Sequence, residues 1–267
     1  MAMAAAPLAA QQPDSLAPAQ PARHYVARYT THPPTIDGRL NDAAWRAAPW
    51  SDAFVDIEGD LKPAPRLRTR MKMVWDSTAL YIAAELVEPD LWATLTQRDA
   101  VIFHDNDFEV FMDPDGDQLN YFELEINALG TVWDLFLPKP YRFGGHARNE
   151  FDMTRLRSAV HLDGTLNHPG DRDKGWTVEL AIPYEDLRQP EITTPVPRAG
   201  DVWRINFSRV EWNLAVDSGR YLKRDSVPTP NHPHPEDNWV WSPQGVINMH
   251  IPERWGYLEF ADRRGRR

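Results

Sequence analysis

The sequence predicts an all-β protein, an antiparallel β-sandwich of about ten strands with a few short helical turns. Segments in which apolar and polar residues alternate with a period of two recur along the chain, and clusters of turn residues separate them. Strands do not alternate with long helical segments, which argues against a parallel α/β fold. The 24 prolines further limit the amount of helix.

The clearest strand pair covers residues 107–113 (DFEVFMD) and 121–127 (YFELEIN). Turn residues at 114–117 separate the two segments, so we predict a β-hairpin or closely neighbouring strands. In both segments the even-numbered residues are apolar, whereas acidic and amide residues predominate at odd positions. The even-numbered face is therefore expected to pack on a core, and the odd-numbered face to meet water or a polar ligand.

The other elements follow in chain order. Residues 25–29 predict a first strand, and Asn41 or Asp42 is expected to cap a short helix whose Trp45 turns inward. Residues 183–188 predict one or two helical turns, and residues 139–152 and 223–235 predict long loops. The remaining predicted strands are 52–56 (an edge), 68–75 and 80–86 (a second hairpin), 130–137, 157–162, 175–182, 201–210, 239–241 and 255–260.

The domain organisation is expected to be simple. We predict a disordered leader at 1–22, one folded domain at 23–262 and a basic tail at 263–267. The leader is rich in alanine, with A-x-A-like spacings typical of a signal-peptide remnant, and its composition equally fits a low-complexity segment. The first interpretation predicts a secreted or periplasmic protein. No segment is long and apolar enough to span a membrane.

Composition excludes several classes of partner and site. The net charge of −10 argues against a nucleic-acid partner, and the lack of cysteine excludes disulfides and thiolate metal sites. The 11 tryptophans supply flat apolar surface that suits both a core and a sugar-stacking site. The sequence leaves the oligomeric state open.

The candidate site is a polar strand face. Glutamate has a low β-strand propensity, so several glutamates in neighbouring strands suggest that they have a function there. Carboxylates, amides and an arginine beside aromatic rings suit a polyol ligand, whereas the alternative is a solvated face with cross-strand charge pairs. With the apolar residues inward, the opposite face is expected to carry Glu85, Glu109, Glu123, Glu125, Asn127, Glu179, Arg204, Asn206 and Ser208.

Only short residue patterns in the sequence suggest metal binding or catalysis. Asp113, Asp115 and Asp117 are spaced as in calcium loops, but the distal glutamate of an EF-hand is missing and the same pattern forms ordinary turns. A pair such as Glu109 and Glu125 could serve a glycan-active hydrolase, although the sequence defines no separation between the two carboxylates. No recognised catalytic motif is present.

The chain resembles the family 9 carbohydrate-binding modules from about residue 33 to residue 260. The resemblance implies an exported, jelly-roll-like sandwich of the DOMON-like group that binds sugar without hydrolysing it. It rests on the order of the motifs IDG (36–38) and AW (44–45), VWD (74–76) and LYI (80–82), NDFEVFMD (106–113), GWTVE (175–179) and IP (182–183), and WG (255–256).

The resemblance also implies roles for particular residues. The family's strand glutamate falls on Glu109 and its first stacking aromatic near Phe103, while its arginine and amide positions fall on Glu125, beside Asn127, and near Ser208. The second stacking aromatic falls near Met249 and His250, and other tryptophans could replace it: Trp133, Trp212, Trp239 and Trp241. The resemblance also implies calcium, for which Asp113, Asp115 and Asp117 are the candidates. Because some DOMON-like sandwiches bind haem, Met249 and His250 support an alternative as an electron-transfer protein.

Overall fold

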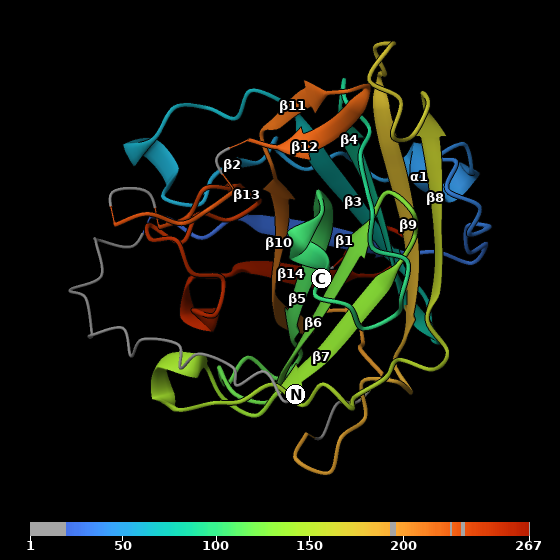
Figure 1. The fold of residues 1–267 in the computed structure, drawn as a ribbon. Helices are drawn as coiled ribbons and strands as arrows, with labels where there is room; N and C mark the ends of the chain where they lie inside the picture. Colours follow the sequence, from blue (N-terminus) through green and yellow to red (C-terminus); the bar gives the residue numbers. More distant parts are fainter. Residues whose placement is uncertain (1–19, 193–195, 225, 231–232, 267) are drawn as a thin grey trace.

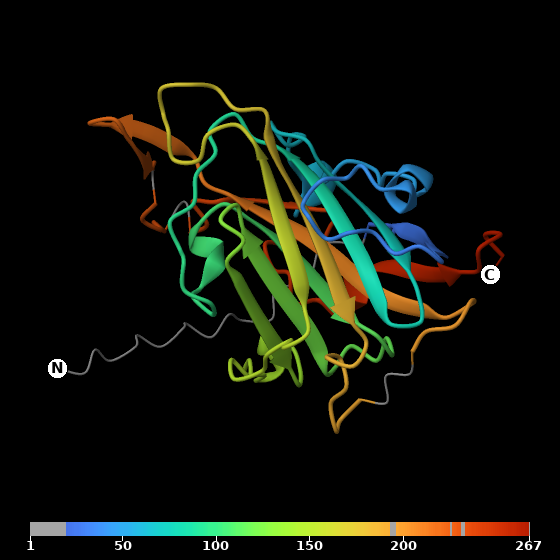
Figure 2. The same ribbon diagram turned by 90° about the vertical axis from the view of Figure 1, so that its right-hand side faces the viewer.

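The computed structural model describes residues 20–192, 196–224, 226–230 and 233–266 and confirms the all-β sandwich (Figures 1 and 2). Of the predicted leader, residues 1–19 lie outside the described residues. Hydrogen bonds join ten strands in the order β7-β6-β5-β10-β14-β1-β3-β4-β9-β8. They are β1 (His24–Tyr29), β3 (Thr69–Trp75), β4 (Ala79–Val87), β5 (Asp107–Asp113), β6 (Tyr121–Asn127), β7 (Val132–Leu137), β8 (Arg157–Asp163), β9 (Gly175–Pro183), β10 (Val202–Glu211) and β14 (Gly256–Ala261).

This path of strands curls into two layers around one core. Strands β5, β6, β7 and β10 form the first layer, and β3, β4, β8 and β9 form the second. The parallel pair β14 and β1 connects the layers. Phe108 and Phe207 of the first layer share a buried apolar cluster with Ile82 and Val178 of the second. Burial of these apolar side chains is the main source of stability.

Smaller elements surround the sandwich. Strand β13 (Asp237–Val240) pairs with β10 and with the short β2 (Val55–Asp56), and α1 (Ala43–Ala47) carries the buried Trp45. Strands β11 (Leu214–Asp217) and β12 (Arg220–Lys223) form a separate two-stranded sheet that the sequence did not predict. The 3-10 turns are η1 (Gly59–Leu61), η2 (Ile102–His104), η3 (Tyr141–Phe143) and η4 (Pro252–Arg254). No helix among the described residues is long and apolar enough to cross a membrane.

The strands of the central hairpin, β5 and β6, begin and end where alternation predicts. Residues 183–188 instead form consecutive tight turns, with backbone hydrogen bonds from Asp186 to Pro183 and from Leu187 to Tyr184. The short helix at Trp45 follows Asp42 as expected, but the Asp42 side chain makes no capping hydrogen bond.

The outer face of the first layer is covered, contrary to the expectation that it meets water or ligand directly. Phe111, Tyr121 and Leu135 on this face pack with Met249 and Trp255 in a second apolar cluster. Met249 and Trp255 belong to the segment between β13 and β14, which folds back over the strands. The polar residues of this face are therefore largely enclosed.

The predicted polar face is divided between the two layers, which corrects the prediction of a single face. Glu85 lies on β4 in the second layer, where Arg68 and Arg70 pair with it at 2.8 and 3.1 Å. Glu179, on β9, is buried and accepts hydrogen bonds from the backbone and from Trp45. Alternation assigns a side chain to one side of its strand but does not say which layer the strand joins.

Candidate functional site

The acidic side chains of β5 and β6 meet on the outer face of the first layer. Glu109 lies directly opposite Glu125 in register, and Ser208 on β10 lies opposite Glu109 on the other side. Directly opposed residues of an antiparallel pair share a face, with Cβ atoms about 4.5–5.5 Å apart. The exposed fractions are 5% for Glu109, 1% for Glu125 and 0% for Ser208. These three side chains therefore form an enclosed polar floor.

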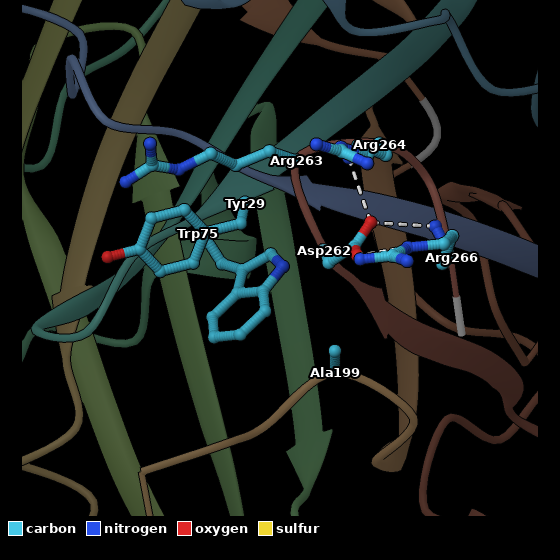
Figure 3. A pocket seen from close by; sticks show the side chains of 7 residues that line it. All are labelled: Tyr29, Trp75, Ala199, Asp262, Arg263, Arg264 and Arg266. Atoms are coloured by element: carbon cyan, nitrogen blue, oxygen red, sulfur yellow. Dashed lines mark hydrogen bonds and ion pairs between the residues drawn. The ribbon is translucent and has the colours of Figure 1, made fainter.

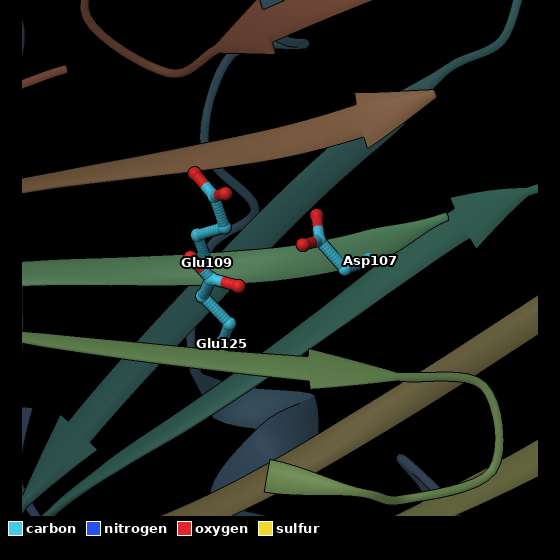
Figure 4. Close-up of side chains that lie close together, drawn as sticks. All are labelled: Asp107, Glu109 and Glu125. Atoms are coloured by element: carbon cyan, nitrogen blue, oxygen red, sulfur yellow. The ribbon is translucent and has the colours of Figure 1, made fainter. Parts of the chain in front are cut away.

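Asp107 joins Glu109 and Glu125 in what we call the acidic cluster, with one carboxylate oxygen of each residue within 4.8 Å of the others (Figure 4). Burial is the main cause that raises the pKa of Glu109 to about 7 and those of Asp107 and Glu125 well above their ordinary values. The charge of Glu109 is the next cause for both Asp107 and Glu125. Glu123 lies beside the cluster, and burial raises its pKa to about 8.

Partly exposed aromatic rings form a rim around this floor. Phe103 is 38% exposed, and its backbone N–H donates a 2.9 Å hydrogen bond to Glu125. Trp133 is half-buried on β7, directly opposite Glu125, and its ring centroid lies 6.2 Å from that of Phe103. Tyr141 of η3 is 44% exposed, and its ring contacts His250 edge-on at 4.5 Å. Such a rim offers flat apolar surface beside hydrogen-bond acceptors.

Phe103 also lines a cleft of about 620 Å³. Trp92 and Trp212 line it together with Lys223 and Glu236. The Lys223 ammonium lies 3.8 Å from the centroid of the Trp212 ring, a favourable cation–π contact. Phe103 therefore borders the cleft and also contacts the acidic cluster through its hydrogen bond to Glu125.

The amides of Asn127 and Asn206, both predicted to bind ligand, anchor the backbone. Asn127 donates a 2.8 Å hydrogen bond to the carbonyl of Leu95 and accepts one from the Thr131 N–H at 3.0 Å. Asn206 donates to the Ser242 carbonyl at 2.8 Å and accepts from the Ser242 N–H at 2.9 Å. Both side chains are fully buried, so these hydrogen bonds hold loops in place beneath the site.

Two further predicted residues also have structural partners. The Arg204 guanidinium donates hydrogen bonds to the carbonyls of Glu253 and Trp255 at 2.5 and 2.7 Å and lies over the ring of Tyr257. Trp239 is 3% exposed and belongs to the main core. Trp133, on the rim, is the tryptophan that the structure brings to the acidic residues.

Met249 and His250 lie on the covering segment. Met249 is buried in the second apolar cluster. His250 Nδ1 lies 3.0 Å from the Tyr121 hydroxyl, and its Nε2 lies 4.0 Å from Glu123. Burial lowers the pKa of His250 to about 3, which disfavours a positive charge on the ring beside Glu123.

The turn between β5 and β6 brings Asp113, Asp115 and Asp117 together, with one oxygen of each within 4.8 Å of the others. The two carboxylate oxygens of Asp113 accept hydrogen bonds from the backbone N–H groups of Gly116 and Gln118, both at 2.9 Å. Asp115 and Asp117 are exposed. The buried carboxylate thus shapes the turn, and the two exposed ones face solvent.

Another cavity, of about 490 Å³, lies where the C-terminal residues pack against β1 and β3 (Figure 3). Tyr29 and Trp75 form its aromatic wall, and Asp262 accepts hydrogen bonds from the backbone N–H groups of Arg264 and Arg266. None of the predicted ligand-binding residues lines this cavity.

The fold and the site define a β-sandwich with an enclosed carboxylate floor and an aromatic rim. The family model described as "Carbohydrate family 9 binding domain-like" matches residues 36–197. Since this match covers more than half of the chain, the protein belongs to that family.

Solved structures agree with this assignment. A family 9 carbohydrate-binding module from Caldicellulosiruptor kristjanssonii in complex with cellotriose aligns over 90% of this chain and 95% of its own, with a TM-score of 0.56 and 17% identity. A module of the same description in complex with glucose aligns over 90% and 97%, with the same TM-score and identity. At this level of identity, the likeness shows the shared fold.

Endo-1,4-beta-xylanase C of Paenibacillus barcinonensis is 27% identical over 169 residues, which cover 63% of this chain. The match spans only 13% of the length of the xylanase. The similarity therefore concerns one part of that larger enzyme.

Sequence reasoning missed parts of the site. Asp107 shows the same alternation as Glu109 and could have been included on that ground. Trp133 could have been placed beside Glu125 once β7 was paired with β6, because the register is continuous. Tyr141 lies in a segment without periodicity, so no sequence signal marked it.

Proposed function

We propose that this protein binds carbohydrate without catalysis at the rim of the acidic floor. Phe103 and Trp133 would stack on the apolar face of a pyranose ring, and Glu109 and Glu125 would accept hydrogen bonds from its hydroxyl groups. The observation that carries the proposal is the contact between Phe103 and Glu125. The Phe103 N–H binds the carboxylate while the ring remains 38% exposed, so a stacking surface and acceptors stand side by side.

The family of this chain and the solved structures similar to it also support carbohydrate binding. The family described for residues 36–197 is one of carbohydrate-binding domains, and similar modules have been solved with cellotriose and with glucose. The cleft beside Phe103 would give a longer glycan room to continue past the aromatic rim. Ser208 would belong to the floor itself, and Asn127, Asn206 and Arg204 would hold the surrounding backbone in place through their hydrogen bonds.

Sugar binding is tested by calorimetry and thermal shift against glucose, xylose and their oligomers. A ligand of the native state should raise the melting temperature by mass action. Phe103→Ala and Trp133→Ala should each weaken binding by at least about tenfold, or ~1.4 kcal/mol, because each removes stacking surface. Trp50→Ala is the matched control, since Trp50 packs under Arg70 and Lys72 of β3 in the other layer. Equal affinity in all three variants, or no binding to any sugar, would reject the proposal.

The non-catalytic part of the proposal is tested with the same ligands. Incubation with xylan, cellulose and their oligomers should release no product. Release that disappears in Glu109→Gln would instead support a glycan-active enzyme using Glu109 and Glu125 as a carboxylate pair.

We further propose that the protein is secreted or periplasmic and serves polysaccharide catabolism. The alanine-rich start of the sequence resembles the remnant of a signal peptide, which supports this location. Fractionation of producing cells should recover the protein outside the cytoplasm, and recovery in the cytoplasm alone would contradict this location.

A further inference from the structure

Two buried carboxylates outside the acidic cluster have nearby donors. Glu88 meets the Arg209 guanidinium at 2.6 Å, and Glu179 accepts hydrogen bonds from two backbone N–H groups and the Trp45 indole. Such pairing is expected, because a buried charge without a partner is costly. The acidic cluster brings three carboxylates together without a positively charged side chain: none of the ion pairs formed among the described residues includes Asp107, Glu109 or Glu125.

Two buried oxygens at the acidic cluster also lack hydrogen-bond partners in the described part of the chain. Asp107 Oδ2 makes no hydrogen bond, although Oδ1 of the same carboxylate accepts one from the Val210 N–H at 3.0 Å. Ser208 Oγ likewise has no partner, and its position opposite Glu109 places it on the same face. Both residues are 0% exposed. Figure 4 shows the Asp107 carboxylate standing beside those of Glu109 and Glu125.

From these contacts we infer that the acidic cluster is a binding site for one divalent cation, with Ser208 as a further oxygen ligand. The donors are hard oxygens, which select calcium, magnesium or manganese over softer metals. Calcium–oxygen bonds of about 2.3–2.6 Å place ligands on opposite sides of the ion roughly 5 Å apart, whereas magnesium places them roughly 4 Å apart. The carboxylate oxygens of the cluster lie within 4.8 Å of one another, so a single cation can contact all three residues.

The cation neutralises carboxylates that otherwise repel one another in an enclosed space, and it gives the free oxygen of Asp107 a partner. The inference goes beyond the proposed function, because cation binding needs no sugar. If the protein binds calcium but no sugar, the cation site is supported and the carbohydrate proposal is rejected. If it binds sugar but no cation, the carbohydrate proposal is supported and the cation site is rejected.

The test uses chelator-treated protein titrated with Ca²⁺, Mg²⁺ and Mn²⁺ in a calorimeter, together with Tb³⁺ luminescence excited through tryptophan. We expect one Ca²⁺ per chain, a rise in melting temperature and sensitised Tb³⁺ emission, since Trp133 lies opposite Glu125. Asp107→Asn should weaken Ca²⁺ binding by at least about tenfold, because even outer-shell partners of a metal are worth about 10–100-fold.

The variants separate this site from the other acidic group and from misfolding. The amide of Asp107→Asn can still accept the Val210 N–H and carries no charge, so the metal-free variant should melt no lower than the metal-free wild type. Asp115→Asn combined with Asp117→Asn removes the exposed carboxylates of the turn and should leave Ca²⁺ binding unchanged. Lack of binding to all three cations, unchanged binding in Asp107→Asn, or loss of binding in the turn variant would overturn the inference.

Discussion

Replacing Arg209 with methionine is expected to lower the free energy of unfolding by about 3–5 kcal/mol, the usual cost of breaking a buried ion pair by removing one partner. The Arg209 side chain is fully buried on β10. Its guanidinium contacts Glu88 at 2.6 Å and Glu211 at 2.8 Å. It also donates hydrogen bonds to the Thr69 hydroxyl and the Val87 carbonyl. Methionine keeps much of the volume but leaves two buried carboxylates without this cation.

Urea unfolding of Arg209→Met and of the control Arg68→Met measures this loss. Arg68 pairs with Glu85 at 2.8 Å, but its side chain is 53% exposed. Exposed pairs contribute about 0–1 kcal/mol, so the control should change stability little. Similar losses in the free energy of unfolding in both variants would mean that burial does not increase the contribution of the Arg209 ion pairs to stability.

Gly38→Ala is expected to cost about 2–5 kcal/mol, through an unfavourable backbone conformation and a collision. Gly38 has a φ of +82°, and an added Cβ would lie 2.6 Å from the carbonyl carbon of Val160 and 2.7 Å from the nitrogen of His161. Since both neighbours are backbone atoms of β8, no side-chain rotation relieves the contact. The shift would also disturb the hydrogen bond from the Gly38 N–H to Glu179.

Gly219→Ala separates the two contributions to this loss. Gly219, between β11 and β12, has a similar φ of +76°, and nothing lies within 4 Å of its added Cβ. The Gly219→Ala variant should therefore lose only the stability that the unfavourable backbone conformation costs, about 1–2 kcal/mol. Chemical denaturation of both variants gives the comparison. Equal losses would show that the close approach between Gly38 and β8 costs nothing.

The sequence is most informative where a strand buries one face. Strands β5 and β6 match their predicted bounds because every even-numbered residue enters the core. Strands β11 and β12 escaped prediction because each has four residues and the pair stands apart from the main sheet. Without a continuous apolar face, such a hairpin shows no clear alternation.

The candidate site was predictable only in part. Alternation brought Glu109 and Glu125 to one face, as observed. Their enclosure was not predictable, because the segment between β13 and β14 that folds over this face has no periodicity. Asn127 and Asn206 illustrate a second difficulty: an amide that anchors a loop and an amide that binds a ligand look the same in sequence.

The parallel pairing of β1 with β14 has a consequence for how the protein is made. His24 pairs with Tyr257 and Arg28 with Ala261, so the junction of the two layers unites strands from opposite ends of the described fold. During synthesis on the ribosome, β1 emerges early, and the edge that pairs with β14 stays unpaired until β14 has been made. Contacts so distant in sequence slow folding, and an unpaired strand edge invites aggregation. The sandwich can therefore close only late in synthesis, and its first strand needs protection until then.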